Sequence, residues 1–171
     1  MNIAAIRSLV EQKSGHAPLN LDDTAAAPLR DLLDHPDIND YVRCCLPQDT
    51  YLASQNQLAV YGLEGIIAEM HPESGPGDCI RRFGYLVVAS SAGGNVVCFH
   101  SPTGRVFWVD HETFAPACIS YKNRSTGEWV FLEEYSPENV EQAMVPLSDN
   151  IEQFLTALLT DQLTARLGAL D

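Results

Sequence analysis

The stretch that decides the fold begins at Tyr85-Leu86-Val87-Val88-Ala89-Ser90. It continues through Ser91-Ala92-Gly93-Gly94-Asn95, Val96-Val97-Cys98-Phe99-His100, Ser101-Pro102-Thr103-Gly104 and Arg105-Val106-Phe107-Trp108-Val109-Asp110. Apolar, β-branched runs separated by short turns rich in Gly, Pro and Asn are typical of antiparallel strands. The sequence therefore predicts a three-stranded meander, with Gly93, Gly94, Asn95 and Gly104 as structural turn residues.

Helical periodicity surrounds this meander on both sides. Apolar residues spaced three and four apart predict helices over residues 2–13, 29–46, 137–144 and 151–167. The second of these should be interrupted near His35-Pro36, because proline disfavours helical geometry in the residue before it. Ser14-Gly15 should end the first helix and Gly168 the last, and Ser148 or Asp149 should cap the last helix at its start.

Shorter strand signals flank the meander. A period of two over Leu58–Gly62 and Ile66–Met70 predicts short strands or one bent hairpin, and 118–121 with 128–132 predicts a separate hairpin. The chain has 171 residues, which suits one domain better than two. We therefore expect an α+β fold: a single domain over residues 1–171, with an antiparallel β-meander sheet packed against N-terminal and C-terminal helices.

The charge balance limits the classes of partner. Lys and Arg total 10 against 23 Asp and Glu, which gives a formal net charge of −13. Nucleic acids and anionic membranes are bound through clustered cations, so neither is expected as a partner. No apolar run reaches the roughly 20 residues of a membrane-spanning helix, and the first residues lack the pattern of a signal peptide. We expect a soluble, cytoplasmic protein.

Motifs for metal, cofactor or nucleophilic chemistry are not found in the sequence. The five cysteines include no C-x-x-C pair, and their odd number does not suggest a disulfide framework. Cys98 and His100 would share one strand face, but two ligands without a third make a poor metal site. There is no P-loop, dinucleotide-binding fingerprint, G-x-S-x-G or H-E-x-x-H motif. We expect no metal, no cofactor and no catalytic residues.

Asp110-His111-Glu112 is the most suggestive short string. A carboxylate beside an imidazole can support acid–base chemistry, but neighbours on a strand point to opposite faces. Solvated residues closing a strand are the simpler interpretation.

Two features favour contact with another protein. Phe107 and Trp108 lie on opposite faces of their strand, so one is exposed unless helices cover both faces of the sheet. An exposed aromatic residue with an acidic rim is typical of an interface, whereas two covered faces would make Trp108 a core residue. Glu133-Glu134 is either part of such a rim or solvated surface. The predicted partner-binding residues are Trp108, Asp110, His111, Glu112, Glu133 and Glu134.

The segment from Gly84 to Phe114 contains, in order, a strand, a Gly-Gly-Asn turn, a strand, a Thr-Gly turn and Val-Phe-Trp-Val-Asp-His. This order resembles the SUKH superfamily, which includes Smi/Knr-type regulators of cell-wall synthesis. Asn150-Ile151-Glu152-Gln153-Phe154-Leu155 is similar to the family's late helix. The best-matched region is 84–160, preceded by an N-terminal helix and an acidic connection over 1–27.

The resemblance implies a non-enzymatic binding domain. Bacterial members look mostly like immunity proteins that neutralise polymorphic toxins of nuclease or deaminase type, so the partner would be a basic toxin, occluded without a covalent step. A regulatory scaffold of the cell-wall type is the first alternative. The second alternative, from another class, is a small hydrolase or ligand-binding enzyme that uses Asp110 and His111.

Overall fold

The predicted meander forms the centre of the computed structural model, which describes residues 1–18, 24, 27–28, 35–42, 50–52, 58–71, 77, 80–110, 120–122, 125–131 and 136–170. Its strands are β3 (Tyr85–Ser90), β4 (Val96–His100) and β5 (Val106–Val109), paired antiparallel in that order. The register of β3 against β4 shifts between Val87 and Ala89. The three predicted strands are confirmed.

Further strands extend the meander on both sides. β2 (Leu58–Val60) and β1 (Thr50–Leu52) follow beyond β3, and β8 (Val145–Ser148) pairs with β5. The order in this sheet is β1-β2-β3-β4-β5-β8, and each neighbouring pair is antiparallel. The α+β class with an antiparallel sheet is therefore confirmed. The sequence analysis did not foresee β8, because Pro146 does not suggest a strand; proline is tolerated there at the sheet edge.

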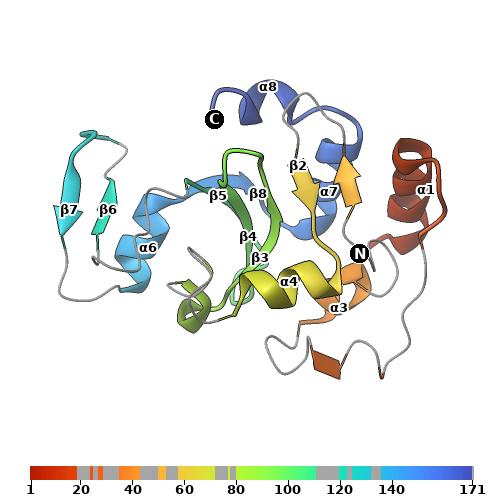
Figure 1. Cartoon of the computed structure of the whole chain (residues 1–171), viewed down its shortest axis with the longest axis horizontal. Helices are drawn as coiled ribbons and strands as arrows, with labels where there is room; N and C mark the ends of the chain where they lie inside the picture. The colour runs from red at the N-terminus through yellow and green to blue at the C-terminus, as the bar shows by residue number, and fades with distance from the viewer. Residues whose placement is uncertain are drawn as a thin grey trace.

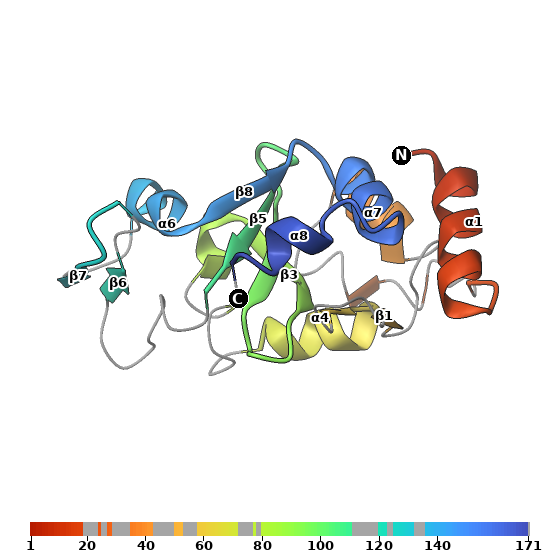
Figure 2. The ribbon, with the colours of Figure 1, turned by 90° about the horizontal axis from the view of Figure 1, so that it is seen from above.

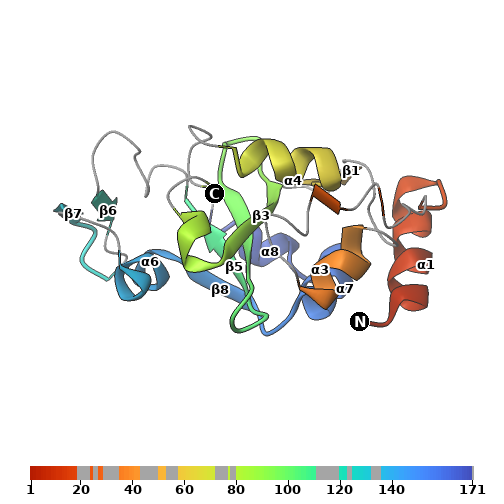
Figure 3. The ribbon, with the colours of Figure 1, turned by 90° about the horizontal axis from the view of Figure 1, so that it is seen from below.

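Helices lie on both sides of the central strands. α4 (Leu63–Glu69) packs on β3, and α7 (Ile151–Leu159) packs beside β8. The views from above and below place α4 and α7 on opposite sides of the sheet (Figures 2 and 3). All four residues of β5 are buried, as are all of β4 except His100. The core therefore occupies both faces of the meander.

One predicted strand is a helix. Residues 66–70 belong to α4 and the turn that follows it, so the strand expected over Ile66–Met70 is wrong. Ile66 and Met70 are both buried, and a spacing of four satisfies a helix as well as a strand. As a helix, the segment packs on β3 and buries Ile66 and Met70 on one face.

The terminal helices meet each other at one end of the sheet. α1 (Ile3–Ser14) ends at Gly15, with φ 75°, as predicted, and packs on α7 and β1. α3 (Pro36–Asp40) begins at the expected interruption, with His35 as its N-cap. The expected cap of α7 is wrong: Asn150, not Ser148 or Asp149, accepts a hydrogen bond from the Gln153 amide at 2.9 Å.

The last helix is also shorter than predicted. α7 ends at Leu159, and α8 (Thr164–Leu167) follows after a turn in which Asp161 has a φ of 61°. The turn lets Leu163 and Leu167, both buried, pack where a straight helix would not place them. The single helix over 151–167 is therefore wrong, although α8 does end at Leu167, with Gly168 as its C-cap.

A hairpin and a short helix form the opposite end of the molecule from α1 (Figure 1). The hairpin strands are β6 (Ser120–Lys122) and β7 (Trp129–Phe131), and α6 (Pro137–Ala143) packs against β6. A 3-10 helix, η2 (Arg81–Phe83), precedes β3. The hairpin and the helix are confirmed within the described residues. The described part of the chain contains no helix with the length and apolar character needed to cross a membrane.

Candidate interaction surface

The structure decides between the two interpretations of Trp108. Its side chain is 0% exposed and that of Phe107 is 2% exposed, because both faces of the sheet are covered. A partner cannot reach either ring in this fold. Trp108 as a partner-binding residue is therefore wrong, and Trp108 is a core residue.

The other predicted contact residues are only partly described. Asp110 follows β5 directly and is half-buried. His111, Glu112, Glu133 and Glu134 lie outside the described residues. Their contact roles, and the pairing of Asp110 with His111 in an enzyme, stay predictions.

The predicted turn residues connect the meander strands. Between β3 and β4, the Ser91 amide donates to the Asn95 carbonyl at 2.7 Å, and Gly94 has a φ of 86°. Between β4 and β5, Gly104 has a φ of 72°. Both glycines adopt the left-handed region that L side chains rarely occupy. Gly93 does not, and an added Cβ there would make only ordinary contacts.

An exposed aromatic residue lies elsewhere, on the hairpin. Trp129 in β7 is 43% exposed, and no other large hydrophobic side chain among the described residues is exposed to this extent. Its neighbour Val130 is half-buried and packs against the core. Because side chains alternate along a strand, Val130 anchors the hairpin while Trp129 lies on the opposite face. Residues 125–129, which we call the hairpin surface, are all exposed.

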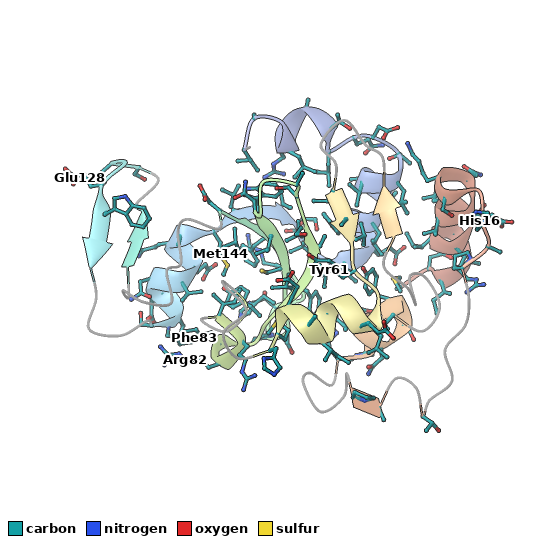
Figure 4. The ribbon with its side chains drawn as sticks, in the orientation of Figure 1. His16, Tyr61, Arg82, Phe83, Glu128 and Met144 are labelled. Carbon is teal, nitrogen blue, oxygen red and sulfur yellow. The ribbon has the colours of Figure 1, made fainter. Side chains whose placement is uncertain are left out.

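Carboxylates lie on and near the hairpin surface. Figure 4 shows Glu128 at the hairpin, at the far end of the molecule from His16. Glu138 and Glu141 are exposed on α6, which packs against β6. Hydrogen bonds from its own backbone N–H and the Ser136 hydroxyl lower the pKa of Glu138. Glu138 therefore stays ionised at neutral pH.

A stacked aromatic group supports this end of the sheet. Tyr85 stacks on His100 with ring centroids 4.2 Å apart, and Phe107 meets the Tyr85 ring edge-on at 5.8 Å. Arg105 covers the Phe107 ring at 5.0 Å and reaches Glu141 at 3.5 Å. Burial, with a further contribution from the charge of Glu141, raises the pKa of Tyr85 to about 12. The Tyr85 hydroxyl therefore stays protonated at neutral pH.

Two other polar features lie elsewhere in the molecule. A hollow of about 960 Å³ lies between β8, α7 and α8, and Asp37, Asp149, Glu152 and Arg166 are among its lining residues. Arg166 is held by the backbone carbonyls of Pro146 and Leu147. On the other side of the sheet, the Tyr61 hydroxyl lies 2.5 Å from Ser90 Oγ and 2.9 Å from Glu69 Oε1. The Glu69 carboxylate is linked to the Ser90 hydroxyl through Tyr61, and no group of three potential metal ligands occurs among the described residues.

The sequence analysis predicted the hairpin but missed Trp129. The available signal was the run Trp129-Val130-Phe131, in which adjacent apolar residues of a strand point to opposite faces. In the structure, β7 pairs with β6 and with no other described strand. A short hairpin can bury only one face against its neighbours, so one residue of each adjacent apolar pair must face outward.

Comparison with known proteins adds no relative: no family model, curated protein or solved structure matches the chain. The SUKH resemblance therefore stays a prediction.

Proposed function

We propose that this chain is a non-enzymatic domain that binds a basic protein through its hairpin surface, and that it acts in the cytoplasm as an immunity protein that occludes a toxin. The exposure of Trp129 is the observation that carries the binding proposal. The toxin as partner rests on the resemblance to immunity proteins and on the acidity of the chain.

Trp129 is not among the residues that pack against the core. Val130 supplies the hairpin's contact with the core, so a small polar residue at position 129 would leave that contact intact. Tryptophan is enriched among the residues that dominate binding energy at protein interfaces, because it buries a large area with few rotatable bonds. Its exposure in the free chain therefore supports a role in binding.

The charge supports a basic partner over a second copy of this chain. Two chains each carrying a net charge of −13 repel one another, whereas a cationic protein is attracted and guided during diffusion. Glu128 adjoins Trp129 in the sequence and is exposed, whereas Lys122 of β6 is the ladder partner of Trp129, so the attraction of a cationic partner rests on the charge of the whole chain. Occlusion would follow from covering the partner's cationic site.

The test is affinity capture from the native cell with three baits: the unchanged chain, Trp129→Ala and Glu11→Lys. Glu11 is exposed on α1, at the opposite end of the molecule, so the third bait shows the effect of a charge change away from the hairpin. A basic protein should be retained by the unchanged chain and by Glu11→Lys, and released as salt rises. Trp129→Ala should weaken its binding by about 30-fold, as expected for a hot-spot residue.

Expression of the captured protein then tests the immunity role. We expect that protein alone to arrest growth, and co-expression of the unchanged chain, but not of Trp129→Ala, to restore it. Capture of a harmless envelope or signalling protein would favour the regulatory alternative. Capture that Trp129→Ala leaves unaltered would overturn the hairpin surface as the contact.

A further inference from the structure

We propose that residues 161–170, which we call the C-terminal strap, open from the folded domain as a unit, and that salt promotes this opening. The strap includes α8, which lies at the top of the molecule in Figure 1. The inference is independent of the hairpin surface and of any partner bound there. It follows from the few contacts that hold the strap in place.

The strap has little helical stability of its own. α8 spans four residues, far fewer than the roughly 12–15 at which an isolated helix becomes marginally stable in water. Its N-cap, Leu163, makes no side-chain capping hydrogen bond. The strap begins at Asp161, whose φ of 61° ends the path of α7, because aspartate enters the left-handed region more readily than most residues. The strap therefore depends on its contacts with the rest of the domain.

Apolar packing and one guanidinium hold the strap against the sheet. Its leucines pack on the core, two of them buried and the last partly buried: Leu163, Leu167 and Leu170. The Arg166 guanidinium donates to the carbonyls of Pro146 and Leu147 in β8. Arg166 and Gln162 also line the hollow between β8, α7 and α8. Opening therefore removes part of the wall of this hollow and withdraws the guanidinium from the edge strand of the main sheet.

An ion pair at the start of the strap makes its opening sensitive to salt. Lys13 Nζ of α1 lies 2.5 Å from Asp161 Oδ2, and the two side chains are 37% and 56% exposed, so salt screens their attraction. Residues 161–170 contain one acidic and one basic residue, so the strap carries no net charge and gains nothing from the self-repulsion of the chain. Salt should therefore weaken the docking of the strap, although it relieves the repulsion within the domain as a whole.

The experiment is amide hydrogen exchange of the full chain, followed by NMR at about 0.01 M and about 0.15 M NaCl. The amides of Leu167 and Gly168, which donate backbone hydrogen bonds within the strap, report its opening, and the amides of β4 report unfolding of the core. Asp161→Asn removes the charge of the ion pair and keeps a residue that tolerates the left-handed region. Glu128→Gln removes the same charge from the hairpin surface and is the matched control.

We expect the protection factors of the strap amides to lie at least about tenfold below those of β4 and to fall by about twofold as salt rises, whereas those of β4 rise. Asp161→Asn should lower strap protection at low salt by about twofold and abolish most of its further fall, and Glu128→Gln should leave that fall unchanged. Arg166→Met, which keeps the aliphatic stem but removes the guanidinium, should lower strap protection by about tenfold.

Two results would overturn the inference. If the strap amides exchange no faster than those of β4, the strap opens only when the whole domain unfolds. If strap protection rises with salt, or falls equally in the unchanged chain and in Asp161→Asn, the ion pair does not control the opening. Neither result bears on capture of a basic protein through Trp129, so this inference and the proposed function fail separately.

Discussion

The two tryptophans of this chain show that position in the fold, and not residue type, decides whether a side chain is buried. Trp108 is 0% exposed between the two covered faces of the sheet, and Trp129 is 43% exposed on a hairpin. We expect Trp108→Ala to lower the free energy of unfolding by about 3–5 kcal/mol, because it leaves a large cavity in the core. Trp129→Ala should lower it by less than Trp108→Ala does, because 43% of the Trp129 side chain is already exposed. Urea unfolding followed by circular dichroism measures both.

The same pair provides a spectroscopic check. Acrylamide should quench Trp129 and leave Trp108 nearly unquenched, so Trp129→Phe should remove most of the quenchable emission. Trp108→Phe is the matched control and should retain it. Comparable quenching of the two residues would contradict the burial of Trp108.

His100 gives a pH dependence of known sign. Partial burial against Tyr85 lowers the pKa of His100 below the usual 6.5, and the charge of Arg105 also lowers it. These effects outweigh the backbone hydrogen bond with Phe83 and the charge of Glu141, which raise the pKa. The unfolded chain then binds the proton more readily, so the stabilising contribution is complete above pH 6.5 and is lost as pH falls through the folded pKa. NMR titration of the imidazole should give a midpoint below 6.5. A midpoint above 6.5 would contradict this.

At the scale of elements, capping of α7 tests the corrected start of the helix. The Asn150 side chain accepts the Gln153 amide hydrogen bond, so Asn150→Ala should cost about 1 kcal/mol of stability. Asp149→Ala is the control, because Asp149 is exposed and is not the N-cap. Thermal unfolding of the two variants measures the difference. A larger loss for Asp149→Ala would restore the cap expected from the sequence.

The elements also show where local pattern is ambiguous. Ile66 and Met70 satisfy a period of two and a spacing of four, and only packing across β3 selects the helix. Asp161, with its positive φ, likewise breaks a run that reads as one helix. In both places the arrangement of distant elements overrides the local signal.

At the scale of the whole molecule, the excess of negative charge should oppose folding. A net charge of −13 produces self-repulsion, which salt screens as the Debye length shortens from about 30 Å at 0.01 M to about 8 Å at 0.15 M ionic strength. The unfolding midpoint should therefore rise across this range of NaCl. Differential scanning calorimetry measures it, with Glu11→Lys as a variant whose salt dependence should be smaller. A midpoint that falls with salt would show that attractive ion pairs dominate.

The sequence by itself determined the meander, its turns, the α+β class, the first helix, the hairpin and the acidity. These depend on local alternation, on glycine conformation and on composition, which need no knowledge of distant contacts. Only the tertiary structure decided which aromatic residue is exposed. Whether a strand residue is buried depends on what covers each face, and α4 and α7 come from segments on either side of the meander in the chain. The same reason explains β8: Pro146 is acceptable in a strand only because that strand lies at the edge of the sheet.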